Sequence, residues 1–169
     1  MKTSLIRIIS AILLLCTVAS VTLIGCSVNK ETTYTSTAKY MMSKVNMTTG
    51  GAATGLNAGE VEAMQILIAN AREICNTNDY ALEVADRIET KYEKAELSAS
   101  DIISSITVNI IEGTTCFYFS ATTNDPDLSY YIADVGGEYL IELYRGHTAY
   151  AISFALIDTP KIPSAPDNQ

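Results

Sequence analysis

Hydrophobic positions follow three different patterns along the chain. Residues 5–26 are almost continuously apolar, residues 60–92 place apolar side chains three and four positions apart, and residues 106–121 largely alternate apolar with polar. These patterns are typical of a membrane-length segment, of amphipathic helices and of strands with one covered face. The sequence therefore predicts an apolar N-terminal segment followed by a folded part that mixes helices and strands.

The folded part is predicted to be an α+β domain of order β-α-α-(α)-β-β-α-β. The expected elements are a strand at 34–45, helices at 60–75, 77–92 and 98–103, strands at 106–112 and 114–121, a helix at 126–144 and a strand at 150–158. Amphipathic helices and half-covered strands must bury their apolar faces against one another. We therefore expect a small mixed sheet with the helices packed on one face.

Local signals mark where helices begin and where one is weak. Ser98 and Asp101 resemble a capping box, and residues 124–126 (Asn-Asp-Pro) offer a capping side chain followed by proline at the first helical position. Gly136 and Gly137 fall in the middle of the last helix and each cost about 1 kcal/mol relative to alanine. They indicate either a weak point in that helix or close packing against the sheet.

The apolar segment Leu5–Cys26 has the length and charge distribution of a membrane helix. It contains no charged residue from Ile8 onward, and Lys2 and Arg7 lie at its N-terminal side. Such a segment can span a hydrocarbon core of about 30 Å at about 1.5 Å per residue. Because basic residues stay in the cytoplasm, we expect a cytoplasmic N-terminus and an extracytoplasmic domain at the bacterial cell membrane.

The same segment also has the parts of a secretory signal. Its end, Leu-Ile-Gly-Cys at 23–26, resembles a bacterial lipobox, which implies cleavage before Cys26 and a lipid on its sulfur. Both interpretations stay open, and both tether the rest of the chain to a membrane. The predicted organisation is a membrane helix or lipoprotein signal at 1–26, an extracytoplasmic domain at 27–158 and a proline-rich segment at 159–169.

The net negative charge of the chain limits the kinds of partner that it can bind. The chain has 11 basic and 19 acidic residues and a net charge of −8. Removing the two basic residues of the apolar segment makes the exported part still more negative. This charge excludes nucleic acid as a partner, because affinity for phosphate backbones depends on basic side chains.

Two of the four cysteines, Cys75 and Cys116, belong to the folded part. Neither has a second cysteine or a histidine at metal-ligand spacing, so no metal site is predicted. In an oxidising compartment the two could form a disulfide, and otherwise they are expected to be buried thiols.

No catalytic set can be assembled from the sequence. His147 is the only histidine, and Ser120 and Ser153 lack the G-x-S-x-G elbow of a nucleophilic serine. The acidic residues from Glu60 to Glu89 fall on polar helix faces, and the glycine-rich stretch 48–55 lacks a phosphate-binding lysine. We therefore predict a protein without enzymatic activity, cofactor or metal.

Four stretches in order resemble a known family. They are YTSTAKYMMSKVN, LNAGEVEAMQILIANAREICNTNDYALEVADRI, LSASDIISSITVNIIEGTTCFYFSATTNDPDLSYYIADVGGEYLIEL and FALIDTPKIPSAPDNQ. Together with the preceding membrane segment they resemble the polysaccharide chain length determinants (Wzz-like polysaccharide co-polymerases), above all the capsule and exopolysaccharide adaptors of Gram-positive bacteria.

The resemblance implies a non-enzymatic membrane regulator of surface polysaccharide chain length or export. It implies homo-oligomers that act with a polysaccharide polymerase or other assembly proteins of the membrane, and a tyrosine autokinase in the complete family form. Pro160, Pro163 and Pro166 match the family segment that leads back to a second membrane helix, whereas no apolar stretch of that length follows Ser27 here. A truncated copy and a single anchor both stay open, and a lipoprotein with an extracytoplasmic binding domain is the alternative function.

Overall fold

A computed structural model describes residues 31–44, 56–93, 97–147 and 152–167. The chain divides into two compact units, Met1–Glu31 and Thr32–Gln169, and all described helices and strands belong to the second. The predictions for Leu5–Cys26 fall outside the described residues. Among the helices that are described, none combines the length and the hydropathy needed to cross a membrane.

The element order agrees with the α+β prediction. The elements are β1 (Tyr34–Lys44), α2 (Ala58–Cys75), α3 (Asn78–Tyr92), α4 (Ala99–Ser105), β2 (Ile106–Ile110), β3 (Cys116–Thr123), α5 (Pro126–His147) and β4 (Ile152–Asp158). Helix α5 continues past the predicted end at Tyr144, and β3 ends two residues later than expected.

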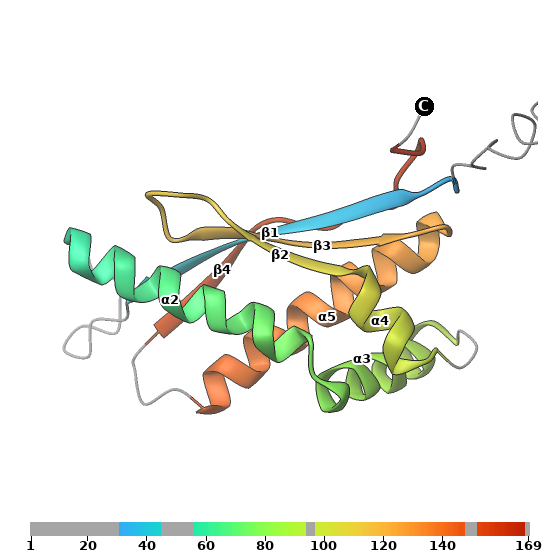
Figure 1. Cartoon of the computed structure of the whole chain (residues 1–169), viewed down its shortest axis with the longest axis horizontal. Coiled ribbons are helices and arrows are strands. Elements are labelled where there is room, and N and C mark those ends of the chain that lie inside the picture. Colours follow the sequence, from blue (N-terminus) through green and yellow to red (C-terminus); the bar gives the residue numbers. More distant parts are fainter. Residues whose placement is uncertain (1–30, 45–55, 94–96, 148–151, 168–169) are drawn as a thin grey trace, which may run out of the picture. The chain divides into compact units, whose positions relative to one another are not determined.

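The prediction of a mixed sheet is wrong, because every neighbouring pair of described strands is antiparallel. The strand order is β2-β3-β1-β4 (Figure 1). Strands β3 and β4 are linked through α5 and run in the same direction, which would give a parallel pair if they were neighbours. Strand β1 lies between them and pairs antiparallel with both.

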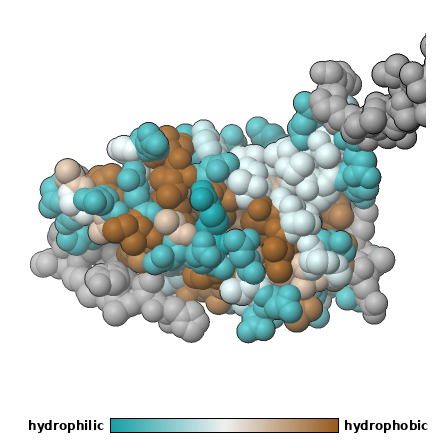
Figure 2. All heavy atoms as spheres, viewed as in Figure 1, coloured by the Kyte–Doolittle hydropathy of each residue, from teal (hydrophilic) through white to brown (hydrophobic). Residues whose placement is uncertain are grey.

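One face of the sheet forms the core and the described helices lie on that face (Figure 1). Along β1, buried and less buried residues alternate, as the period of two requires. The covered-face residues of β1 are Ser36, Ala38, Tyr40 and Met42, and they join Phe117, Phe119 and Ala121 of β3 and Val108 of β2. Figure 2 shows that apolar residues visible on one side of the molecule form separate patches between hydrophilic ones.

The two glycines of α5 mark close packing rather than a weak point. A Cβ atom at Gly136 would lie 2.8 Å from the Phe119 ring, and one at Gly137 would overlap the Tyr40 hydroxyl. The buried Tyr80 hydroxyl of α3 donates a hydrogen bond to the Gly136 carbonyl oxygen over 2.6 Å. The glycines therefore let α5 approach both the sheet and α3.

Capping side chains begin three of the described helices, and the cap of α4 is the predicted one. At α4, Ser98 and Asp101 form the expected capping box, and at α3 the Thr77 side chain accepts from the Tyr80 amide. At α2, Asn57 is the capping residue and forms a second capping box with Glu60. These local bonds satisfy amide groups that the first helical turn leaves without partners.

Candidate functional site

The two ends of the domain meet at the start of β1. The Asp167 amide donates to the Thr33 carbonyl oxygen over 2.8 Å, and the Thr35 hydroxyl donates to the Asp167 carboxylate over 2.7 Å. In Figure 1 the C-terminal segment accordingly lies beside the first residues of β1. The chain therefore enters and leaves the described domain at the same place.

The proline-rich segment is part of the folded domain up to Asp167. Pro160 is buried, while Pro163 and Pro166 are half-buried. The buried Ser36 hydroxyl of β1 donates to the Lys161 carbonyl oxygen over 2.8 Å. This segment therefore runs along the part of β1 that β4 does not reach, and it holds the two ends of the domain together.

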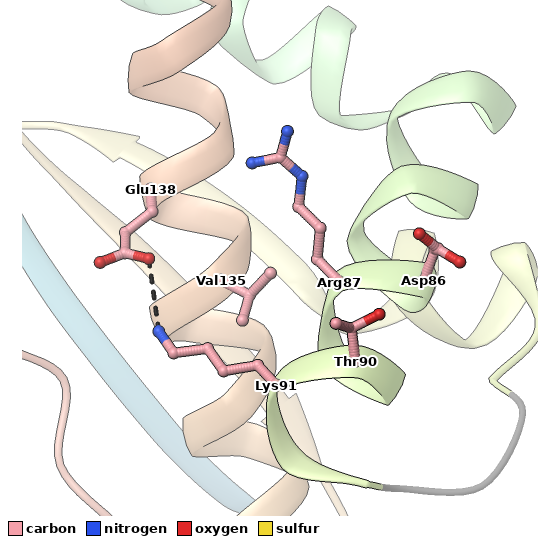
Figure 3. A pocket seen from close by; sticks show the side chains of 6 residues that line it. All are labelled: Asp86, Arg87, Thr90, Lys91, Val135 and Glu138. Carbon is pink, nitrogen blue, oxygen red and sulfur yellow. Dashed lines mark hydrogen bonds and ion pairs between the residues drawn. The ribbon is translucent and has the colours of Figure 1, made fainter.

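Helices α3 and α5 are joined by a second cluster of polar contacts (Figure 3). Arg87 binds Glu83 at 2.7 Å and Glu142 at 2.6 Å, and its guanidinium lies 4.3 Å from the centre of the Tyr139 ring. Lys91 lies in the same groove and pairs with carboxylates of α5, Asp134 at 2.8 Å and Glu138 at 3.4 Å. The groove between the helices has a volume of about 340 Å³.

Electrostatics in this groove favour the charged forms of its bases and the neutral forms of its phenols. The hydrogen bonds that Arg87 donates to Glu142 and Glu83 raise the pKa of Arg87, and the bond that Lys91 donates to Asp134 raises the pKa of Lys91. Burial and the hydrogen bond to Asp134 raise the pKa of the Tyr92 hydroxyl. Each cation here already has a carboxylate partner, so the groove is organised for helix packing rather than for proton transfer.

The sequence-predicted site residues are scattered. Cys26 lies outside the described residues, as does the glycine-rich stretch 48–55. His147 is the last residue of α5. Ser120 shares a 2.9 Å hydrogen bond with the Thr37 hydroxyl, and Glu60 binds Lys44 at 2.8 Å, so both have structural partners.

The two thiols of the described domain are free, and the disulfide considered for them is absent. Cys75 is buried under the sheet, and burial raises the pKa of its thiol to about 12. Cys116 pairs with Met41 on the opposite, uncovered face. No described group of three His, Cys, Asp or Glu side chains could hold a metal ion.

Two features of this geometry were not found from the sequence. The ion pairs of Arg87 and Lys91 connect helices about 50 residues apart, and no local pattern specifies such partners. The bonds of Thr33 and Thr35 to Asp167 join the two ends of the domain, although the regular spacing of the three prolines did signal an extended segment.

Comparisons with known proteins leave the family open. No family model and no curated protein matches the chain. Among solved structures, one match is the crystal structure of the intact alpha subunit of aIF2 from Pyrococcus abyssi. It is 12% identical, with a TM-score of 0.35, over 77% of this chain and 36% of that chain. The chain thus spans about a third of that protein, and a likeness at this TM-score carries no argument about fold or function.

Proposed function

We propose that this protein is a membrane-anchored, non-enzymatic regulator of surface polysaccharide chain length or export. The proposal combines the ordered resemblance to polysaccharide chain length determinants with the Leu5–Cys26 segment and the fold of the domain that follows. The structural observation in its favour is the meeting of Thr33 and Asp167 at one end of β1.

The contact between Thr33 and Asp167 is consistent with a domain that is anchored at a membrane. A segment that leaves the membrane just before residue 31 would deliver the chain to the start of β1. The proline-rich segment returns to the same point, which is the place where the family's second membrane helix would begin.

Homo-oligomers and contacts with a polymerase of the membrane belong to the same proposal. Because the described domain begins and ends at one place, protomers anchored in one membrane would be tethered at the same end of this domain. Light scattering of the full chain in detergent measures this directly, and a monomer at all concentrations would contradict the oligomer.

The second candidate is a lipoprotein with an extracytoplasmic binding domain, favoured by the sequence 23–26. It differs from the first in the chemistry of Cys26. Intact mass spectrometry of the membrane-extracted protein separates the two, because a lipoprotein begins at a lipid-modified Cys26 and an uncleaved anchor retains residue 1.

Deletion of the gene tests the function itself. We expect the size distribution of the surface polysaccharide to change while its sugar composition stays the same, because a regulator alters when growth stops. Complementation with the full chain should restore the distribution. An unaltered distribution after deletion would rule out the regulatory role.

A further inference from the structure

Few charged residues occur at the end of the sheet where the two ends of the domain meet. The stretches 32–38, 117–123 and 159–166 contain a single charged side chain, Lys161, although the whole chain has a net charge of −8. Two carboxylates that flank these stretches accept hydrogen bonds: Asp125 from the Asp127 amide and Asp167 from the Thr35 hydroxyl. This end of the domain therefore meets less repulsion at an acidic surface than the chain as a whole would.

The proline-rich segment exposes an isoleucine at this end. Pro160 is buried, and the Lys161 carbonyl oxygen accepts from the Ser36 hydroxyl, which fixes the segment against β1. The next side chain, Ile162, is 53% exposed, and the Lys161 side chain beside it is 79% exposed. Binding to a membrane surface draws on these two terms, buried apolar area and attraction to anionic lipid.

The position of Ile162 matters because the chain enters the domain close by. Lys161 contacts Ser36, which lies three residues after Thr33 and so about 10 Å along β1. The seven residue steps from Cys26 to Thr33 span at most about 25 Å. With Cys26 at a membrane surface, as either proposed anchor requires, Thr33 lies within that distance of the lipid, and Ile162 can reach it.

A single exposed isoleucine needs no explanation by itself, and Ile66 of α2 is 58% exposed. Its neighbour Gln65, however, donates to the Thr114 carbonyl oxygen, and the residue after Thr114 accepts from the Met42 amide. Met42 lies about 30 Å along β1 from Thr33. The two isoleucines are therefore alike in exposure and different in their distance from the point of entry.

The internal stretches that the structure does not describe attach elsewhere. Residues 45–55 follow Lys44, and residues 148–151 precede Ile152. Lys44 pairs with Ile152 near the other end of β1, about 25 Å along the strand from Ser36. The surface around Ile162 therefore borders the two ends of the domain.

We propose that the proline-rich segment docks on the lipid surface, with Ile162 in the interface and Lys161 against lipid phosphates. The proposal rests on the proposed membrane anchoring and adds a contact that orients the domain at the membrane. Because the anchor already holds the domain near the surface, docking is intramolecular, and one apolar and one basic side chain suffice. The net negative charge of the chain disfavours adsorption through its other surfaces.

Tryptophan fluorescence tests this contact, because the chain contains no tryptophan and an introduced one reports only its own surroundings. The full chain with Ile162→Trp is reconstituted in vesicles of phosphatidylcholine and phosphatidylglycerol, with or without lipids brominated near the headgroup end of their acyl chains. We expect a blue-shifted emission and at least about twofold quenching by the brominated lipids. The matched variant Ile66→Trp should show neither effect.

Lys161→Glu in the Ile162→Trp background tests the basic side chain. Quenching in vesicles that contain phosphatidylglycerol should fall, because a carboxylate replaces the cation beside the lipid phosphates. In vesicles of phosphatidylcholine alone the same substitution should change the quenching less. Ala165→Trp, at another exposed position of the segment, provides a second reporter should Ile162→Trp lower the melting temperature.

Flotation of the vesicles separates the docking from the anchoring, and neither result depends on the polysaccharide. A chain that floats with the vesicles, but is quenched no more with Ile162→Trp than with Ile66→Trp, overturns the docking and leaves the anchoring intact. A chain that does not float overturns the anchoring and the docking with it. A blue shift of the Ile162→Trp protein that grows with protein concentration and resists brominated lipid would assign the segment to a second copy instead.

Discussion

Substitution of Gly137 by alanine sets two effects of opposite sign against each other. In an exposed helix, alanine is more stable than glycine by about 1 kcal/mol. At Gly137, however, the new Cβ would overlap the Tyr40 hydroxyl and lie 3.1 Å from two carbon atoms of its ring. The balance depends on whether that ring can move away.

The surroundings of Tyr40 hold it in place. Its side chain is 5% exposed and its ring stacks on Phe117 with centroids 5.4 Å apart. Overpacking of a core typically costs about 1–3 kcal/mol, which exceeds the gain in helix propensity. We therefore expect Gly137→Ala to lower the free energy of unfolding by about 1–2 kcal/mol and the melting temperature by about 3–8 °C.

Thermal unfolding followed by circular dichroism measures this change, and two variants control it. Gly59→Ala lies in a helix where the new Cβ meets only the Asn57 side chain at 3.4 Å, so this variant should gain stability, by up to about 1 kcal/mol. In a Tyr40→Phe background the cost of Gly137→Ala should shrink by about 1 kcal/mol. A Gly137→Ala protein as stable as the wild type would refute the close approach of α5 to β1.

Three further predictions follow from burial and hydrogen bonding. In thiol labelling at pH 8 followed by peptide mapping, Cys116 should react in the folded protein and Cys75 only after unfolding; equal rates would contradict the burial of Cys75. Burial raises the pKa of Tyr144 to about 12 and also raises the pKa of Tyr80, whereas unfolded phenols ionise near pH 10. Folding therefore keeps both phenols neutral, and the melting temperature should stay level from pH 7 to 9 and fall above about pH 10; a flat profile to pH 11.5 would refute this. Arg72→Met keeps the apolar stem but leaves the Val108 carbonyl of β2 without its donor, so the free energy of unfolding measured in urea should fall by about 1–2 kcal/mol. An unchanged urea midpoint would argue against a stabilising role for this hydrogen bond.

The order of elements was predictable because its signals are local. The capping box of Ser98 and Asp101 and the proline at the start of α5 are decided by residues close in sequence. The mixed sheet was wrong because the position of β1 between β3 and β4 depends on contacts far apart in the chain. Hydrophobic periodicity gives the face of a strand but not its neighbours.

The functional surfaces were predictable only in part. The proline spacing indicated an extended segment near the end of the domain, but its bonds to Thr33 and Thr35 required the fold. The hydrogen bonds from Arg72 of α2 to the Val108 carbonyl of β2 had no sequence signal, because they join residues 36 positions apart. The sequence left open whether Gly136 and Gly137 mark a weak point or close packing. The aromatic rings of β1, β3 and α3 that lie against the two glycines show that they mark close packing.

We propose that this domain, anchored at a membrane, regulates polysaccharide length without making or breaking glycosidic bonds. The most direct measurement is the length distribution of the surface polysaccharide in a deletion strain that expresses the full chain at graded levels. We predict that the modal length shifts with expression while the linkages and total sugar stay constant. A constant modal length, with or without a change in amount, would contradict the account.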